Sequence, residues 1–339
     1  MAVREEILDL LSGNKINRVP AFSGLSHVTA AGLEHEGLAF HEIHRDADKM
    51  ARAAASTFRL TGFSSAAAPF DLCVEAEALG AEVDFRENAI YEFPRVAKPP
   101  FQTSEVVKDF RSLGRIPLIC EAIAKLKTDI GENAVIGGIL AGPYTLLSML
   151  VERGALFKEM RNQPETVIQS LLHLSSFISQ TGHAYRTAGA DFLTIHEMGG
   201  SPKVLGAARF EQFVFPALKK LLDDLPHPRV LAVCGNVGVI TSLLAAAGAD
   251  AISIDQSNDL AAVRSALPDS LLFGNLDPVE LLSRGAPDQV RAEAEQARRA
   301  GVDALWPGCD LVPSTPLENT RAMITDVTYR PEGLGKKRD

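Results

Sequence analysis

The sequence predicts a single (β/α)8 barrel, and three observations support this fold. Eight short apolar runs alternate with longer amphipathic stretches, which is typical of a parallel sheet covered by helices. The chain has 339 residues, a usual length for one such barrel. No low-complexity segment, short repeat or Pro/Ser-rich linker divides it. We therefore expect one barrel domain over residues 1–330 and a flexible tail over 331–339.

The expected elements follow one another in a regular order. Residues 5–14 predict a cap helix in front of the barrel, and residues 80–94 predict an inserted β-hairpin. Long stretches such as 164–189 and 287–301 have helical spacing and end near glycine. The eight expected strands share an apolar composition and a polar or glycine-containing turn behind them; they are 18–22, 64–70, 134–140, 191–195, 229–233, 250–254, 271–275 and 303–307.

Composition and charge exclude several classes of function. The net charge of −9 argues against a general binder of nucleic acid or anionic membranes, which needs clustered Lys and Arg. The uncharged run at 134–151 contains Gly-Pro in its middle, which predicts a strand, a loop and a helix start rather than a membrane span. The four cysteines are widely spaced and form no CxxC pair, so we expect the reducing cytoplasm.

Polar side chains follow the last five expected strands. The carboxyl ends of barrel strands are where the active sites of such folds are built. These ends carry an imidazole, three carboxylates, an amide and two thiols: His196, Glu197, Cys234, Asp255, Asn275, Asp277 and Cys309. The sequence therefore predicts that these groups meet at one mouth of the barrel.

Cys234 and Cys309 stand at equivalent strand ends, and each is next to a glycine. A lone free cysteine usually behaves as a small apolar core residue, but two at the same mouth suggest a shared role. Their strands are not neighbours, so a disulfide requires the loops to lean together. A zinc ion, with Zn–S bonds of about 2.3 Å, needs less distortion. Two thiols with a carboxylate or imidazole leave one coordination position open, as in catalytic zinc sites.

Five segments resemble the uroporphyrinogen decarboxylase superfamily, and within it the methylcobalamin:coenzyme M methyltransferase branch. They are 69–80, 135–150, 252–256, 274–278 and 306–323. In the last segment, Pro-Gly-Cys-Asp followed by Thr-Pro-Leu-Glu-Asn is specific to the methyltransferases, because the decarboxylases have Gly-His-Gly there. The resemblance implies a TIM barrel and a zinc-dependent, corrinoid-dependent methyltransferase. Such an enzyme moves a methyl group between a corrinoid, such as methylcobalamin, and a small thiol or a methylated O, N or S compound.

The resemblance also implies a partner. The chain shows no Asp-x-His-x-x-Gly cobalamin-binding segment, so we expect the corrinoid on a separate carrier protein. The small-molecule methyl donor or acceptor and the direction of transfer are left open. The oligomeric state, a homodimer included, is left open too.

The zinc motif that the resemblance implies is incomplete in this chain. The family motif is His-x-Cys at the end of the fifth strand with a distant second Cys, and Cys234 and Cys309 match its thiols. Ala232 occupies the histidine position. Either zinc is absent, or another strand end supplies the third ligand. Strand alternation turns only one of His196 and Glu197 toward the barrel axis, and we expect Glu197 to be both a metal ligand and a catalytic residue.

Further residues are expected around this centre. Asp255 is a second catalytic candidate. His196, Asp71, Tyr144 and Asn275 are the expected substrate-binding residues. Asp71 stands where the decarboxylases place a pyrrole-binding aspartate.

Two other functions are compatible with the resemblance. One is tetrapyrrole decarboxylation, but the segment 21–44 contains no Arg or Lys to bind substrate carboxylates as the arginine-rich loop of the decarboxylases does. The other is a non-catalytic binding relative. The missing histidine at Ala232 favours that reading, whereas retention of both thiols weighs against it.

Overall fold

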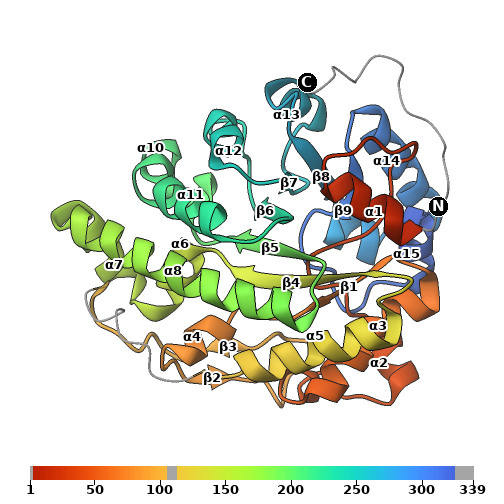
Figure 1. Cartoon of the computed structure of the whole chain (residues 1–339), viewed down its shortest axis with the longest axis horizontal. Coiled ribbons are helices and arrows are strands. Elements are labelled where there is room, and N and C mark those ends of the chain that lie inside the picture. The colour runs from red at the N-terminus through yellow and green to blue at the C-terminus, as the bar shows by residue number, and fades with distance from the viewer. Residues whose placement is uncertain (1–2, 105–112, 325–339) are drawn as a thin grey trace.

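The computed structural model describes residues 3–104 and 113–324, so the predicted tail at 331–339 lies outside the described residues. Seven parallel strands form one curled sheet in which neighbours follow chain order (Figure 1). They are β1 (Ser65–Ala68), β4 (Val135–Ala141), β5 (Phe192–Glu197), β6 (Arg229–Val233), β7 (Ala251–Ile254), β8 (Leu271–Leu276) and β9 (Ala304–Pro307). Each overlaps a predicted run, which confirms seven of the eight expected strands.

The expected first strand, 18–22, is not a regular strand. It forms one parallel bridge to Leu305 of β9, and Ser23 donates its backbone N–H to the Ser65 side chain of β1 at 2.9 Å. The segment therefore closes the barrel between β9 and β1 as extended chain. Pro20 has no N–H to donate to a ladder, which helps to limit the pairing to one bridge. The prediction of eight regular strands is therefore wrong for the segment 18–22.

Helices surround the sheet on its outer side (Figure 1). The α-helices beyond the amino-terminal one are α2 (Ala30–Glu36), α3 (Ala47–Thr61), α4 (Val74–Ala78), α5 (Ile116–Ile130), α6 (Pro143–Leu150), α7 (Arg153–Asn162), α8 (Pro164–Ala188), α9 (Pro202–Leu205), α10 (Ala207–Arg209), α11 (Phe215–Asp224), α12 (Thr241–Ala247), α13 (Leu260–Ala266), α14 (Pro287–Arg299) and α15 (Leu317–Ile324). Three short helical segments are η1 (Glu42–His44), η3 (Phe210–Val214) and η4 (Pro278–Ser283). Within the described ranges, no helix has both the length and the apolarity needed to span a membrane.

Local sequence signals explain where the helices begin and end. Before α3, the Asp46 side chain accepts a hydrogen bond from the Lys49 N–H, as is usual for an N-cap residue. The helix ends at Gly62, whose φ of 80° is the left-handed conformation that glycine adopts without a steric penalty.

The cap helix is confirmed, and an inserted hairpin is present whose second strand lies just beyond the predicted range of 80–94. α1 (Val3–Leu11) covers most of the predicted stretch. The hairpin pairs β2 (Val83–Asp84) with β3 (Arg95–Val96) in antiparallel fashion. Both lie outside the seven-stranded sheet, so they are additions to the barrel.

The barrel interior is a packed aromatic core. Phe22, Phe192, Phe273 and Trp306 are fully buried, and the ring of Phe22 meets the other three edge-to-face at centroid distances of 5.3–6.0 Å. Such contacts add to the stability gained by burying the rings. These rings fill the interior of the barrel below the carboxyl-terminal strand ends.

Candidate metal centre

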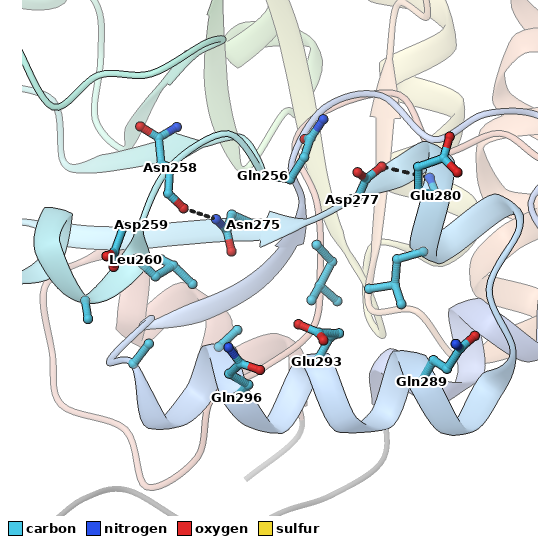
Figure 2. Close-up of a pocket in the computed structure, with 15 residues that line it drawn as sticks. Gln256, Asn258, Asp259, Leu260, Asn275, Asp277, Glu280, Gln289, Glu293 and Gln296 are labelled. Atoms are coloured by element: carbon cyan, nitrogen blue, oxygen red, sulfur yellow. Dashed lines mark hydrogen bonds between the residues drawn. The ribbon is translucent and has the colours of Figure 1, made fainter.

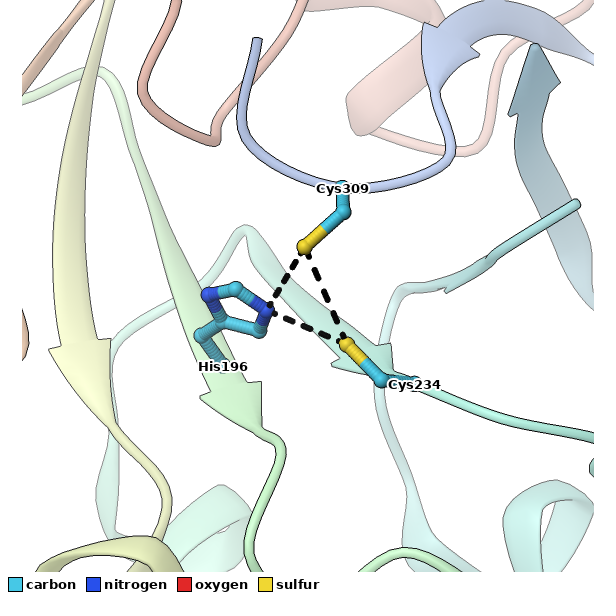
Figure 3. A group of neighbouring side chains, drawn as sticks. All are labelled: His196, Cys234 and Cys309. Atoms are coloured by element: carbon cyan, nitrogen blue, oxygen red, sulfur yellow. Dashed lines mark hydrogen bonds between the residues drawn. The ribbon is translucent and has the colours of Figure 1, made fainter. Parts of the chain in front are cut away.

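An imidazole and two thiols meet at the carboxyl-terminal mouth. His196 lies near the end of β5, Cys234 directly follows β6, and Cys309 lies just beyond β9. His196 Nε2 is 3.4 Å from Cys234 Sγ and 3.9 Å from Cys309 Sγ, and the two sulfurs are 4.0 Å apart. Figure 3 shows the three side chains pointing toward one another from three separate segments. Among the described residues, these form the one group of three or more His, Cys, Asp or Glu side chains close enough to hold a metal ion.

The triangle fits a tetrahedral zinc ion. With Zn–S bonds of about 2.3 Å and a Zn–N bond of about 2.1 Å, the ligand atoms lie about 3.8 Å (S to S) and about 3.6 Å (S to N) apart. The three measured separations lie between 3.4 and 4.0 Å. Two thiolates and an imidazole are a common donor set for zinc, and a fourth position stays open.

His196 lies beside the position where the expected family histidine is missing. In the register of the sheet, His196 of β5 pairs with Ala232 of β6, and neighbouring strands lie about 4.8 Å apart. Phe192 and Ala232 both belong to the cluster inside the barrel, so alternation turns His196 inward as well. The imidazole therefore reaches the thiols from the adjacent strand at the same height.

The pKa values of His196 and Cys309 both lie above their usual values. Burial alone would lower the pKa of His196, but its hydrogen bond to Cys309 and the nearby Asp310 carboxyl raise it to about 9. Contact with the Cys234 thiol, together with burial, raises the pKa of Cys309. A divalent cation among these groups would lower both pKa values, because it stabilises thiolate sulfur and neutral imidazole.

The prediction that Glu197, rather than His196, faces the thiols is wrong. The Glu197 carboxylate accepts hydrogen bonds from the backbone N–H groups of Tyr144, Thr145 and Gly200 at 3.1, 3.0 and 2.9 Å, and from the Thr145 hydroxyl. It thus binds the amino-terminal turn of α6, where a negative charge is favourable. The alternation of β5 is the reason, because it turns position 197 outward and position 196 inward.

Asp255 holds loops together beside the thiols. Its carboxylate accepts hydrogen bonds from the N–H of Gly235, which follows Cys234, and from the N–H of Ser257 at 2.9 Å. The Asn258 side chain also donates to it, at 3.1 Å. These contacts fix the loop that presents the Cys234 thiol, and a catalytic role for Asp255 stays a prediction.

Asn275 lies in a groove away from the metal centre. Its side-chain amide donates to the carbonyls of Asp255 and Asn258 at 3.2 and 3.1 Å. Figure 2 shows it with the loop after β7, the end of β8 and α14 around a groove of about 710 Å³. The groove shares no lining residue with the metal triangle, so a role for Asn275 in binding substrate at the triangle stays a prediction.

Asp71 and Tyr144 are held by other protein groups. Both Asp71 oxygens accept hydrogen bonds from Arg115 at 2.9 Å. Although burial opposes it, this guanidinium keeps the pKa of Asp71 well below its usual range. The Tyr144 side chain is buried and donates its hydroxyl to the Met160 sulfur at 3.4 Å. Their predicted contacts with substrate remain predictions.

Sequence reasoning missed a cavity beside Asp310, whose carboxyl interacts electrostatically with His196. It has a volume of about 430 Å³, and its lining includes Met198 and Asp310, which stand close in sequence to His196 and Cys309. The inserted hairpin and α6 supply other walls. No motif marks it, because the walls come from segments that are far apart in the chain.

Comparison with known proteins gives the family. The family model described as uroporphyrinogen decarboxylase (URO-D) matches residues 3–329. The chain belongs to the uroporphyrinogen decarboxylase family. This result confirms the resemblance seen in the sequence.

Within the family, the chain is similar to methyltransferases over nearly its whole length. It is 29% identical to the methylcobamide:CoM methyltransferase MtbA of Methanosarcina acetivorans, over 95% of this chain and 96% of the relative. A uroporphyrinogen decarboxylase of a Synechococcus strain is 27% identical, over 75% of each chain. The solved structure of a methyltransferase from Methanosarcina mazei superposes with a TM-score of 0.91 at 28% identity, covering 96% of this chain and 97% of that one. This superposition confirms the predicted TIM-barrel-like fold.

Proposed function

We propose that this protein is a zinc-dependent methyltransferase that moves a methyl group between a corrinoid and a small thiol or a methylated O, N or S compound. The observation that carries the proposal is the triangle of His196, Cys234 and Cys309, with every pair of its ligand atoms within 4.0 Å. The near full-length similarity to methylcobamide:CoM methyltransferases supports it. Both thiols require a reducing environment, which agrees with a cytoplasmic enzyme.

The three side chains would hold zinc and leave one position free for the substrate. When bound, zinc supplies a Lewis acid that keeps a substrate thiol deprotonated at neutral pH or polarises a methylated heteroatom. Asp255 fixes the Cys234 loop, and Glu197 fixes the end of β5 that carries His196. When bound, a methylated corrinoid would supply the methyl group for transfer to a thiol. The electron pair of the broken bond would remain with the corrinoid, and the thiol proton would leave to solvent.

The partner in this reaction is a corrinoid, and we propose that a separate carrier protein delivers it over the mouth. The aromatic core below the triangle closes the barrel from the other side. Corrinoid and substrate must therefore both approach from the carboxyl-terminal loops. An active site at this end is general for such barrels.

Decarboxylation of a tetrapyrrole has less support. The resemblance implies a pyrrole-binding aspartate at the position of Asp71 in the decarboxylases, whereas here each Asp71 oxygen accepts a hydrogen bond from Arg115. The match to a Synechococcus decarboxylase also covers less of the chain than the match to the methyltransferase.

Zinc analysis of purified protein tests the ligand set. We expect about one zinc per chain in the wild type and loss of most of it in His196→Ala, Cys234→Ser and Cys309→Ser. Exposed His35 provides the matched control, and His35→Ala should keep the metal. Zinc-free wild-type protein, or full zinc in His196→Ala, would contradict the proposal.

A rescue variant sharpens the test. Because His196 and Ala232 are register partners, Ala232→His should restore zinc to the His196→Ala variant. Methyl transfer from methylcobalamin to a thiol, followed by the corrinoid absorbance, should return with the metal. Zinc that returns without methyl transfer would refute the assignment of the reaction and leave the metal site intact.

A further inference from the structure

The cavity of about 430 Å³ has Asp310 in its wall, and the Asp310 carboxyl interacts electrostatically with His196 of the triangle. Met198 lies two residues beyond His196, and Asp310 directly follows Cys309; both line the cavity. The other walls come from the loop after β1, from the hairpin strand β3 and from α6. The end of the cavity at Asp310 is therefore the end from which a bound molecule would approach the triangle. The volume is in the range of small-molecule sites, about 300–1,000 Å³.

Most of the remaining wall is apolar. Aromatic, aliphatic and thioether side chains form it: Phe70, Leu72, Phe93, Val96, Met149 and Met198. Contact with apolar groups of a ligand removes this surface from water and so stabilises the complex. The methionines can adapt to different shapes, because their side chains are flexible and polarisable.

The polar groups of the lining already have protein partners. Asp71 is held by Arg115 through two hydrogen bonds of 2.9 Å. The Ser148 hydroxyl donates at 2.8 Å to a backbone carbonyl of its own helix. The side chain of Arg95 is 65% exposed and lies 3.7 Å from Asp84. Among the residues that line the cavity, none offers a buried cation that could bind an anionic ligand.

The inner end of the cavity is acidic rather than basic. Asp310 accepts a hydrogen bond from the Ser26 N–H at 2.8 Å and stands next to Cys309. A carboxyl group here offers no attraction to a sulfonate, phosphate or carboxylate. Apolar walls and an acidic inner end thus both disfavour an anionic substrate.

We propose that the small substrate of the methyl transfer has an uncharged, largely apolar body, such as an aryl or alkyl group, that lies in this cavity with its reacting heteroatom at the thiols. The proposal rests on the proposed function, since it names the substrate class of the same centre. An uncharged, apolar substrate distinguishes this chain from an enzyme whose methyl acceptor is a small anionic thiol.

Binding experiments with matched thiols test the substrate class. Calorimetry on the zinc-loaded full chain would compare benzyl mercaptan with coenzyme M, a thiol that carries a sulfonate. We expect benzyl mercaptan to bind at least tenfold more tightly. Met149→Lys should reduce its affinity at least tenfold and improve that of coenzyme M, because the new ammonium lies in the apolar wall. Val279→Lys, an equivalent change outside the cavity, should alter neither affinity.

Two additions separate this inference from the proposed function. Anisole, which has no thiol, should bind to the zinc-free wild type by saturation-transfer NMR and not to Met149→Lys. If Met149→Lys does not fold, Val96→Lys introduces the same charge from the hairpin. Wild-type protein that purifies without zinc but binds anisole would refute the metal site and support the cavity assignment. Tighter binding of coenzyme M than of benzyl mercaptan, or no anisole binding, would overturn the inference whatever the zinc content.

Discussion

Removing the Glu197 carboxylate should damage the fold far more than the metal site. The carboxylate accepts hydrogen bonds from three buried backbone N–H groups and from the Thr145 hydroxyl. Glu197→Ala leaves the three N–H groups unpaired at a cost of roughly 1–3 kcal/mol each, or about 3–9 kcal/mol together. That is comparable to the whole stability of many domains, about 5–15 kcal/mol. We therefore expect little folded Glu197→Ala protein.

Glu197→Gln is the informative variant. Its amide oxygen keeps part of the acceptor set, so we expect a loss of about 1–3 kcal/mol. Unfolding in urea, followed by the fluorescence of Trp306, the single tryptophan of the chain, measures that loss. Zinc should remain at about one ion per folded chain, because His196 and not Glu197 faces the thiols. Glu165→Gln, at an exposed glutamate, should match the wild type in both measurements.

One result would refute this reasoning. If Glu197→Gln folds with wild-type stability but purifies without zinc, then the carboxylate binds the metal, and the geometry of β5 given above is not that of the zinc-bound protein. If stability and zinc content both fall, the zinc content per folded chain decides whether Glu197 acts through the fold or as a metal ligand.

Four other predictions concern buried groups. Burial raises the pKa of Glu75 to about 8 from its usual 4.5, so the folded state keeps a proton that the unfolded chain releases. The free energy of unfolding should therefore fall as pH rises from about 4.5 to 8, and Glu75→Gln should abolish this slope in urea unfolding at several pH values. The Asp71 carboxyl behaves oppositely, because Arg115 lowers its pKa against the effect of burial. Its stabilisation should be lost as pH falls below the usual aspartate range, and Asp71→Asn should flatten that acid limb in the same experiment. Arg115→Gln should cost about 3–5 kcal/mol, since it leaves a buried carboxylate unpaired. Phe22→Ala should cost about 3–5 kcal/mol by thermal unfolding, because it removes the ring that contacts the other three barrel aromatics.

The sequence predicts elements well where local patterning determines them. Apolar runs of five to seven residues became β1 and β4–β9, and Gly-Pro at 142–143 correctly marked the start of α6. It fails at 18–22, because whether that segment pairs regularly depends on the distance between β9 and β1. The order of parallel strands also brings Cys234 and Cys309 to the same mouth, and this was predictable from their positions at strand ends.

By itself, the sequence determined a barrel with two thiols at its mouth, because strand period and strand order follow from local apolar patterning. Only the tertiary structure decided which neighbour joins those thiols. The alternation of β5 turns His196 inward and Glu197 outward, and the β5–β6 register sets His196 beside Ala232. The tertiary structure alone also brings the hairpin and α6 together to form an apolar cavity. Register and packing between distant segments depend on the whole chain, and no local run of residues contains them.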